Sequence, residues 1–587
     1  MTMPQSNSDK LDSMRHSLAH LLASAVLEMF PEAKLGIGPV IENGFYYDFE
    51  LPRTLMPEDL PLLEQKMRQI IRANVPFARE ELPAEEALKL FSKINQPYKE
   101  ELINDLQTEN TKTVSLYKTG PFVDLCRGPH IQTTREIPLD SFKLTKIAGA
   151  YWKGSEKNKM LQRVYGIAFA QKSELKDYLY KLAEAEKRDH RKIGKDLDLF
   201  VTSELVGSGL PLFTPKGALL RNLLDEYVWE LRKICGFQKV AIPHITRKEL
   251  YEKSGHWQKF SDELFKIKSR EGHEFALKPM SCPHHIQIFD RKLYSFRDMP
   301  VRYCESTMVY RDEQSGELGG IARVRGITQD DSHVFCAQSQ IEKEVLMIWD
   351  IIKKFYSTFN FDLRIRLSLH DPKQFEKYLG TPEIWKAAED SLKNIAKYRG
   401  AEFEIGIGEA ALYGPKIDFI AKDSLGRDWQ MATIQLDFNQ PERFDLNFIN
   451  DQGQKERVVI IHCAVMGSLE RFMAVLIEHY AGAFPVWLSP VQIAVLPVTT
   501  SHNAKAKKLA KLFEQENIRV LFDDAKESVG KKIRNAQMQK IPYMIVFGDK
   551  EAKSKNLFIK ERGKEKVSQT TQKAFIEKIK KQIEKRK

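Results

Sequence analysis

The chain has 587 residues, of which 42% are hydrophobic and 29% are charged, a balance that is typical of a soluble globular protein with several domains. None of its apolar runs approaches the roughly 18 residues of a membrane span, and the N-terminus has no basic-then-apolar signal pattern, so we expect neither a membrane protein nor an exported one. The six cysteines are scattered without the spacing of a small disulfide-rich domain, which predicts a cytoplasmic protein with reduced thiols.

The net charge of +11 is concentrated at one end of the chain. Residues 501–587 contain 24 Lys and Arg against 11 Asp and Glu, a net charge of +13, so the preceding 500 residues sum to −2. A basic terminal domain beside a near-neutral body favours a polyanionic partner, nucleic acid first. A well-solvated, helix-rich surface would give the same charge, and charge alone does not separate the two readings.

Residues 11–29 have the apolar periodicity of an amphipathic helix. His16 and His20 lie one turn apart on the face opposite the apolar stripe, beside small residues, which predicts a pair outside the core with room for a ligand. Further on, the segment FVDLCRGPH supplies Asp124, Cys126 and His130. The H-x3-H and C-x3-H spacings fit a zinc site, and exposed histidines without a ligand fit them equally well.

Residues 171–193 are predicted to form one charged amphipathic helix that joins two domains. A helix over 215–237 and a short strand with Pro243 follow. A strand that ends near Met280 leads to a helix that opens at Cys282 and Pro283, where a proline suits the first turn. The segments LYGPKIDFIAK and DWQMATIQLDF alternate as in an antiparallel sheet, and ERVVIIHCAVMGSLERFMAVLIEHY changes from a buried strand to a helix. The basic tail alternates strands and helices as an α/β domain does.

The segment from 310 to 335 holds the densest set of chemically useful residues: YRDEQSGELGGIARVRGITQDDSHVF. A glycine-rich turn with an extended return over 321–327 would bring Arg311 and Arg323 close together. Two guanidinium groups at one site suit a polyphosphate, since each can hold two oxygens. A charged surface hairpin is the alternative that this segment alone leaves open.

Taken in order, these motifs resemble those of the class II aminoacyl-tRNA synthetases, and most closely those of the threonyl-tRNA synthetases. Pro243 fits the first class motif, Arg311-Asp312-Glu313 the second, and the segment GSLER at 467–471 the third. Between them stand KPMSCP, RVRGITQDDSH, LYGPKID and TIQLDF, and the resemblance runs from the helix of His16 to about Gly563. It implies a multidomain α+β fold with an α+β editing domain over 1–170, a linker helix over 171–193, a class II antiparallel sheet core with helices over 194–488, and an α/β anticodon-binding domain over 489–587.

The resemblance also implies an ATP-dependent ligase that converts L-threonine to threonyl-adenylate and transfers it to tRNA(Thr). One Zn2+ per subunit and Mg2+ with ATP are the implied cofactors, and a homodimer through the catalytic domain is the implied assembly. The implied zinc ligands are Cys282, His333 and His462. The implied ATP-binding residues are Arg311, Glu313, Arg323, Gln430 and Arg471, and the catalytic set is Arg311, Arg323, Arg471, Lys416 and His256. The implied threonine pocket consists of Asp331, Tyr413, Gln329, Gln435, Met280 and Ser468.

Editing and anticodon recognition follow from the same resemblance. Serine keeps the hydroxyl group of threonine and lacks only a methyl group, which is worth roughly 1 to 3 kcal/mol of discrimination, so serine is expected to pass the first selection. The family removes it from Ser-tRNA(Thr) by hydrolysis, and the matching residues here are His16, His20, Cys126, His130 and Asp124. The anticodon-binding positions that match are Arg534 and Glu551.

Several positions depart from the family pattern. No ubiquitin-like domain precedes the editing domain, so either this member is short or the sequence is trimmed. His284 replaces a common glycine and Cys463 a common arginine, while Lys526 stands for asparagine and Lys560 for arginine. A lysine keeps a phosphate contact but not a bidentate base contact. A catalytically inactive tRNA-binding protein on the same scaffold is the rival reading, and the retained ATP-site arginines and Glu313 argue against it.

Overall fold

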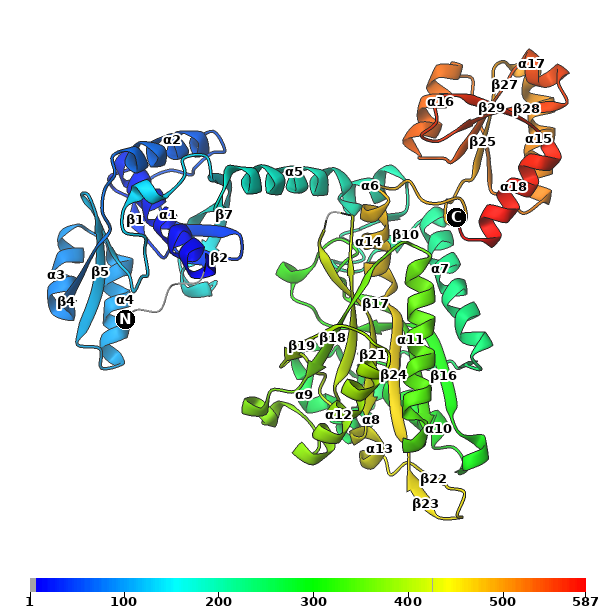
Figure 1. Cartoon of the computed structure of the whole chain (residues 1–587), viewed down its shortest axis with the longest axis horizontal. Coiled ribbons are helices and arrows are strands. Elements are labelled where there is room, and N and C mark those ends of the chain that lie inside the picture. Colours follow the sequence, from blue (N-terminus) through cyan, green and yellow to red (C-terminus); the bar gives the residue numbers. More distant parts are fainter. Residues whose placement is uncertain (1–6, 425) are drawn as a thin grey trace. The chain divides into compact units, whose positions relative to one another are not determined.

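The computed structural model describes residues 7–424 and 426–587 and divides into two compact units, one that ends at Ala183 and one that begins at Glu184. Figure 1 labels many of the elements of both. Among the described residues, no helix is long and apolar enough to cross a membrane.

The first unit is an α+β structure around the helix α1 (Asn7–Met29). That helix packs with α2 (Asp59–Arg72) against a five-stranded sheet, and Leu18, Leu21 and Leu22 are fully buried there. The sheet consists of β1 (Lys34–Leu35), β2 (Val40–Ile41), β3 (Gly44–Glu50), β7 (Phe142–Tyr151) and β8 (Met160–Ala168). A smaller sheet consists of the strands β4 (Ala78–Pro83), β5 (Thr113–Thr119) and β6 (Phe122–Leu125). The helices α3 (Ala84–Lys93) and α4 (Pro97–Thr108) connect β4 to β5.

The linker differs from the single helix that the sequence predicts over 171–193. The chain forms α5 (Lys172–Arg188) and a second helix, α6 (His190–Asp196). Asp189 interrupts them because its backbone is non-helical (φ −50°, ψ 120°) and its side chain accepts a hydrogen bond from the backbone N–H of Arg191 at 2.8 Å. Aspartate is favoured at such a helix start, so this one residue caps a new helix.

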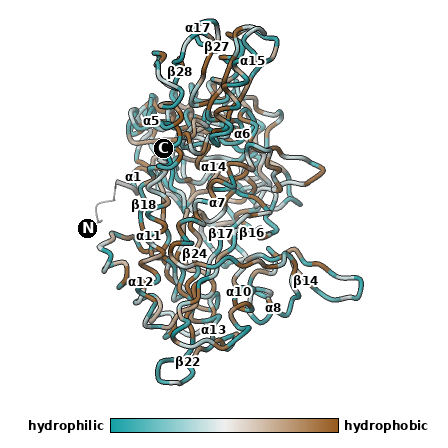
Figure 2. The backbone as a smooth tube through the Cα atoms, turned by 90° about the vertical axis from the view of Figure 1, so that its right-hand side faces the viewer, coloured by the Kyte–Doolittle hydropathy of each residue, from teal (hydrophilic) through white to brown (hydrophobic). Residues whose placement is uncertain are grey.

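The second unit is built on an eight-stranded sheet, antiparallel except for one parallel pair at each edge. In spatial order its strands are β11 (Gln238–Lys239), β16 (Val301–Tyr310), β17 (Gly326–Cys336), β24 (Val459–Ser468), β21 (Asp428–Asp437), β20 (Lys416–Lys422), β18 (Leu363–Leu369) and β19 (Phe403–Ile407). The helices that share its main core are α7 (Pro215–Ile234), α11 (Ile341–Ser357), α12 (Pro382–Tyr398) and α14 (Leu469–His479). Figure 2 shows the hydropathy of these elements along the backbone.

Shorter elements surround the sheet. They are β9 (Phe200–Val201), β10 (Leu212–Phe213), β12 (Ile245–Arg247), α8 (Lys248–Ser254), α9 (His256–Lys259), β13 (Lys266–Lys268), β14 (Glu274–Leu277), α10 (Cys282–Phe289), β15 (Tyr294–Ser295), α13 (Asn439–Arg443), β22 (Asn447–Ile449) and β23 (Lys455–Arg457).

The antiparallel pair β20 and β21 and the change from strand β24 to helix α14 confirm the predictions for those segments. Three expected strands are shorter than predicted. The strand with Pro243 is confined to Gln238–Lys239, and the Ile242 N–H donates to the side chain of Glu305 instead of to the sheet. Strand β14 ends at Leu277 rather than near Met280. The return strand begins at Gly326 rather than at Ile321, because the preceding residues form a tight turn that the Gly319 N–H closes on the Arg323 carbonyl at 3.1 Å.

The C-terminal part of this unit is an α/β fold with strand order β26, β25, β27, β28, β29. The parallel strands β25 (Ile493–Pro497), β26 (Val520–Phe522) and β27 (Tyr543–Phe547) confirm the predicted ones. The prediction missed the antiparallel strands β28 (Asn556–Glu561) and β29 (Val567–Thr571). The sequence of β29 is polar, whereas β28 does alternate, with Leu557 and Ile559 buried. The helices are α15 (Asn503–Gln515), α16 (Val529–Met538), α17 (Asp549–Lys553) and α18 (Gln572–Glu584).

Candidate functional site

A cavity of about 550 Å3 lies over the central strands of the eight-stranded sheet, a size that is common for small-molecule sites. Side chains two residues apart on a strand point to the same face, so β17 turns Gln329, Asp331 and His333 toward the cavity together. Pairing of the strands brings His333 opposite His462. The structure gathers these predicted residues in the cavity lining: Met280, Cys282, Arg311, Gln329, Asp331, His333, Tyr413, Lys416, Gln430, Gln435, His462, Ser468 and Arg471.

One end of the cavity contains the predicted metal ligands. The ligand atoms of Cys282, His333 and His462 all lie within 4.8 Å of one another, and the three side chains are buried. His333 Nε2 is buried without a hydrogen-bond partner, while its Nδ1 lies 2.8 Å from His285 Nδ1. A thiol and two imidazoles are a ligand set that zinc prefers, and the unpartnered ring nitrogen of His333 is free to bind the ion.

The surroundings of these ligands favour the same interpretation. Burial raises the pKa of Cys282 and lowers that of His333, so both groups are uncharged without a cation. His462 Nε2 lies 2.9 Å from Asp437 Oδ2, and a carboxylate that orients a ligating imidazole is a common outer partner in metal sites. Sequence analysis did not single out Asp437, whose only sequence signal is its place at the end of the TIQLD segment.

The amino-acid part of the cavity lies next to the metal ligands. Asp331 is buried, and burial raises its pKa, an effect that the nearby His462 and Ser281 partly offset. The ring of Tyr413 lies 4.8 Å from the ring of His462. Gln435 donates to the Gly414 carbonyl at 3.2 Å. A buried carboxyl group beside two imidazoles suits a small polar ligand that can donate hydrogen bonds.

The other end of the cavity is rich in guanidinium groups. Arg311 Nε is buried without a partner, and Arg471 Nε donates to the Ala322 carbonyl at 3.1 Å. Desolvation lowers the pKa of Arg471, and so do the positive charges of Arg323 and Arg311. Arg323 pairs with Glu313 at 2.7 Å and stands outside the cavity lining. Two guanidinium groups in the cavity lining, with a third beside them, favour a polyanionic ligand.

Lys416 and Gln430 meet on a carboxylate that sequence analysis did not identify. Asp418 is fully buried, and it lies 3.1 Å from Lys416 Nζ and accepts from Gln430 Nε2 at 2.9 Å. Ser368 and Thr433 also donate to it. Asp418 therefore fixes the orientation of two predicted ligand-binding side chains. Its position in LYGPKID is a signal that could have revealed it.

His256 is fully buried and does not belong to the cavity lining. Its Nδ1 lies 2.8 Å from Ser254 Oγ, its Nε2 has no partner, and its ring centre is 5.9 Å from that of Tyr413. Burial lowers its pKa to about 3, helped by the charges of His462, Arg443 and Arg311. The imidazole is therefore neutral at physiological pH.

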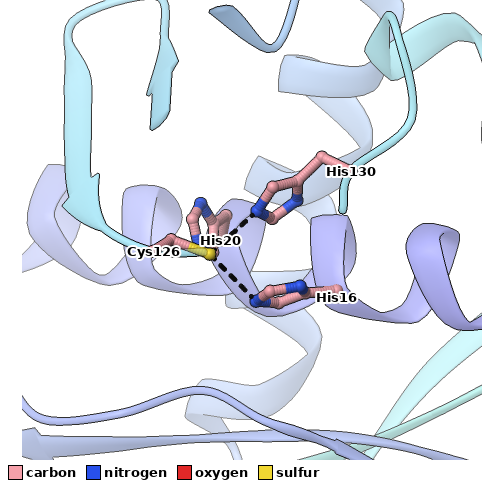
Figure 3. Close-up of side chains that lie close together, drawn as sticks. All are labelled: His16, His20, Cys126 and His130. Carbon is pink, nitrogen blue, oxygen red and sulfur yellow. Dashed lines mark hydrogen bonds between the residues drawn. The ribbon is translucent and has the colours of Figure 1, made fainter. Parts of the chain in front are cut away.

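A second group of reactive side chains lies in the first unit (Figure 3). His16 and His20 come from α1, and Cys126 and His130 come from the segment after β6. Cys126 Sγ lies 3.3 Å from His16 Nε2 and 3.3 Å from His130 Nε2, and one ligand atom from each of the four lies within 4.8 Å of the others. The structure thus joins the H-x3-H and C-x3-H motifs.

The prediction that both α1 histidines lie outside the core is wrong for His20. That side chain is only 2% exposed, and Ala19 and Ala23 are fully buried, whereas His16 is partly exposed. Ala19 and Ala23 belong to the hydrophobic core around α1, so the small neighbours of this pair do not leave an open cleft.

Two further residues complete this group, and sequence analysis missed both. Lys99 Nζ lies 2.5 Å from Asp124 Oδ1 and donates to Tyr47 Oη at 3.0 Å, and Tyr47 donates to Asp124 Oδ2 at 2.6 Å. All three are buried, and His20 Nε2 is 3.6 Å from Asp124. Lys99 and Tyr47 lie on separate elements, so no spacing in the sequence joins them to the histidine motif.

The imidazoles of this second group are neutral at physiological pH. Burial lowers the pKa of His20 and of His130, and the charges of neighbouring groups lower both further. Burial also lowers the pKa of His16 and raises that of Cys126 to about 11. Neutral imidazoles can bind a metal or hydrogen-bond to a water, so the geometry fits either a bound cation or a positioned water.

The predicted anticodon residues lie in the C-terminal fold. Arg534 is exposed on α16, and Glu551 lies on α17, where its carboxylate accepts from the Gly548 N–H at 2.9 Å. The Glu551 contact caps the helix, so this carboxylate already has a structural partner.

Family models match three segments of the chain. Residues 265–480 match the tRNA synthetase class II core domain (G, H, P, S and T), residues 492–582 match an anticodon binding domain, and residues 114–165 match the threonyl and alanyl tRNA synthetase second additional domain. The antiparallel sheet and its cavity, together with these matches, define a class II aminoacyl-tRNA synthetase.

Individual relatives narrow the class. The threonine–tRNA ligase of Acetivibrio thermocellus is 47% identical over 551 residues, which cover 94% of this chain and 85% of the relative. That of Dehalococcoides mccartyi is 47% identical over 554 residues, which cover 94% and 93%. The chain belongs to the threonine–tRNA ligase family. A solved structure described as the RNA binding domain of threonyl-tRNA synthetase from Cryptosporidium parvum is also similar, with a TM-score of 0.64 and 36% identity over 67% of this chain and 98% of that one.

Proposed function

We propose that this protein joins L-threonine to tRNA(Thr) with ATP, the activity for which its relatives are named. The observation that carries the proposal is the single cavity with arginines at one end and a Cys-His-His group at the other. A polyphosphate and a small amino acid would meet between these ends, as the first step of the reaction requires.

The Cys-His-His group would hold Zn2+, with Cys282, His333 and His462 as its ligands. Bound zinc would supply a Lewis acid for the amino and hydroxyl groups of the amino acid. Asp331, whose pKa is raised by burial, lies where it can pair with a ligand hydroxyl group. Valine would leave this carboxyl group unpaired, so the pocket would reject valine more strongly than serine.

The arginines would perform the activation step. Attack of the threonine carboxylate on the α-phosphorus of Mg2+-bound ATP forms threonyl-adenylate and releases pyrophosphate, and Arg311 would stabilise the charge that builds up. Arg323 and Arg471 would hold the outer phosphates. Arg323 now pairs with Glu313, so we infer that ATP takes Arg323 onto its phosphates while Glu313 turns to the adenine amino group.

Transfer to tRNA would follow in the same cavity. The terminal ribose hydroxyl must lose a proton as it attacks the adenylate carbonyl. His256 has an unpartnered Nε2 that could take this proton. Burial lowers its pKa to about 3, so the ring would become an effective base only if α9 moved it toward the cavity and out of its buried position. Lys416, held by Asp418, adds positive charge beside the departing phosphate.

Amino-acid-dependent exchange of pyrophosphate into ATP tests the ligase proposal. We expect threonine to support the fastest exchange, serine to be slower by about 10- to 200-fold in kcat/KM, and valine to be slower still. A metal chelator is expected to abolish the exchange. If serine, proline or glycine supported exchange better than threonine, the assignment of threonine would be wrong.

The histidine group of the first unit supports a second activity, hydrolysis of Ser-tRNA(Thr). Neutral imidazoles next to the buried Lys99 and Asp124 can position a water or a metal ion against an ester. The double variant His16→Ala, His20→Ala is expected to accumulate Ser-tRNA(Thr) while it still forms Thr-tRNA(Thr). A variant of the exposed His273 to Ala serves as the control. Unchanged serine clearance in the double variant would exclude the role of these histidines.

We also infer the organisation around these sites. Residues 1–170 would be the editing domain, 194–488 the catalytic domain and 489–587 the anticodon-binding domain, in which Arg534 and Glu551 would contact the anticodon. A homodimer through the catalytic domain would cover Ile234, whose side chain at the end of α7 is 82% exposed. Sedimentation of an Ile234→Asp variant against the parent protein tests the dimer, since a buried charge should weaken it.

A further inference from the structure

One histidine outside the cavity joins three segments that lie far apart in the sequence. His190 begins helix α6 and is 7% exposed. Its Nδ1 lies 2.7 Å from the Oε1 atom of Glu478 on α14, and its Nε2 lies 3.2 Å from the backbone nitrogen of Ile321 in the segment between β16 and β17. Its own backbone N–H also donates to Glu478 Oε1, at 3.1 Å.

The partners determine where the ring carries its proton. A carboxylate oxygen can only accept, so Nδ1 donates to Glu478, and a backbone N–H can only donate, so Nε2 accepts from Ile321. The ring is therefore neutral and uses both nitrogens. The possible ligand atoms of Asp189, His190 and Glu478 lie as close together as those of a metal site. However, neither ring nitrogen of His190 remains free to bind a cation, and Arg427 already pairs with Glu478.

The segment that His190 contacts is a tight turn over residues 319–323. The Gly319 N–H closes it on the Arg323 carbonyl, and Ile321 is fully buried. Gly320 packs directly on the imidazole: a Cβ atom there would lie 2.2 Å from His190 Nε2, and its φ of +57° favours glycine. The ring thus fixes one side of this turn.

Arg471 holds the other side of the turn, because its Nε donates to the Ala322 carbonyl at 3.1 Å. Arg471 and Glu478 are seven residues apart on α14, about two helical turns, so they lie along the same face of the helix. Helix α14, the His190 ring and the turn therefore form a closed set of contacts, and Arg323 projects from that turn.

We propose that His190 is a positioning residue for ATP: it holds the turn of Arg323 at a fixed place relative to Arg471, so that both guanidinium groups can bind one polyphosphate. This inference rests on the proposed ATP-dependent function. Preorganised cations bind a polyphosphate better than mobile ones because less reorganisation is needed on binding. Threonine binds at the other end of the cavity, so its affinity should not depend on His190.

Two substitutions separate the two hydrogen bonds of the ring. In His190→Asn the amide nitrogen takes the place of Nδ1, which keeps the Glu478 contact and loses the turn. In His190→Gln the amide oxygen takes the place of Nε2, which keeps the turn. We expect His190→Asn to raise the KM for ATP in threonine-dependent exchange by about tenfold with the KM for threonine unchanged, while His190→Gln stays within about threefold of the parent protein.

Calorimetric titration with ATP measures the same effect as a Kd and does not depend on exchange activity. The parent protein and an exposed control, His273→Asn, test the ligase proposal itself. If neither protein shows threonine-dependent exchange, the ligase proposal is refuted. The ATP titration then still decides whether His190 positions the ATP site. Equal ATP defects in the Asn and Gln variants, an ATP affinity unchanged in His190→Asn, or a parallel loss of threonine affinity would each overturn the inference. If His190→Asn does not fold, Gly320→Ala keeps His190 and pushes the turn off the ring, and an ATP affinity that it leaves unchanged would overturn the inference as well.

Discussion

His333 shows at the scale of one residue what a ligand site needs from its surroundings. One ring nitrogen has a histidine partner, and the other is buried without any. An unpartnered buried nitrogen costs about 1 to 3 kcal/mol, so a ligand at this position would recover part of that free energy. The thiol of Cys282 is the partner that makes zinc the best match.

Cys282→Ser tests this metal site directly. Replacement of the soft thiolate by a hydroxyl group is expected to remove zinc from the purified protein and to abolish threonine-dependent exchange. Metal analysis of the variant, beside Cys235→Ser as a control thiol outside the group, measures the first effect. Full zinc occupancy in Cys282→Ser would show that another set of residues holds the metal.

Cys463 is a buried thiol that lies beside a buried cation. The guanidinium group comes from Arg232 on α7. That side chain is 3% exposed and donates to the backbone carbonyl of Asp330 at 2.8 Å and to its carboxylate at 3.2 Å. Burial and the neighbouring carboxylate of Asp330 raise the pKa of Cys463 to about 12, although Arg232 opposes this. Sequence reasoning noted the cysteine but could not identify the arginine, because the two positions are far apart in the chain.

Helix α1 is the element on which the second site depends, and the histidines of that site make the first unit sensitive to acid. Burial lowers the pKa of His16, His20 and His130 in the folded protein, while the unfolded chain titrates near 6.5. Below about pH 6.5 the unfolded chain therefore binds protons that the folded unit does not. Folding stability should fall by about 1.4 kcal/mol per pH unit for each histidine that stays unprotonated.

The change of folding stability with pH can be measured by urea unfolding of the intact protein in the presence of a chelator, with hydrogen exchange of the α1 amides as the readout. We expect the free energy of opening to decrease from pH 7 to pH 5.5, and to decrease less in a variant with all three histidines changed to Asn. The same slope in both proteins would show that other groups cause the acid sensitivity.

Elements with a regular hydrophobic pattern could be predicted from the sequence, but the segments that pack against them in space could not. The periodicity of residues 11–29 predicted α1, and alternation predicted β20 and β21. The burial of His20 was not predictable, because it depends on a segment that begins over 100 residues later. The break at Asp189 was visible as a capping residue, but the charged pattern on both sides favoured one continuous helix.

For the whole molecule, the distribution of charge predicts strong salt dependence of tRNA binding. Residues 501–587 carry a net charge of +13, and phosphate contacts release counterions. The Kd for tRNA(Thr) is expected to rise at least about a hundredfold between about 50 and 200 mM salt. Threonine-dependent exchange needs no tRNA and should change little over the same range.

Filter binding or anisotropy across a salt series measures this dependence. Arg534→Ala should weaken tRNA(Thr) binding about tenfold or more at fixed salt, while Lys573→Ala, on the separate helix α18, serves as the control. A Kd that is independent of salt would contradict a phosphate-based interface.

The fold class and family could be predicted from motif order, because those motifs are tied to specific backbone turns. The cavity residues came from the same resemblance rather than from spacing, since strand pairing brings His333 opposite His462 and the start of helix α10 adds Cys282. Asp418, Lys99 and His190 were not predicted. Lys99 and His190 act through tertiary contacts for which a single sequence carries no signal, whereas Asp418 stands in the LYGPKID motif, which does carry one.

Alternation along β17 has a consequence for protein engineering. Gln329, Asp331 and His333 face the cavity, while Asp330 faces the opposite side, where its carboxylate accepts from the backbone N–H groups of Val465 and Met466. Libraries that aim at a new amino-acid substrate can therefore vary Gln329 and Asp331 and leave Asp330 fixed. Adjacent residues of β17 can therefore be treated differently in directed evolution: substitutions at the cavity-facing positions change which substrate binds, and the residue on the opposite face keeps the sheet intact while they are selected.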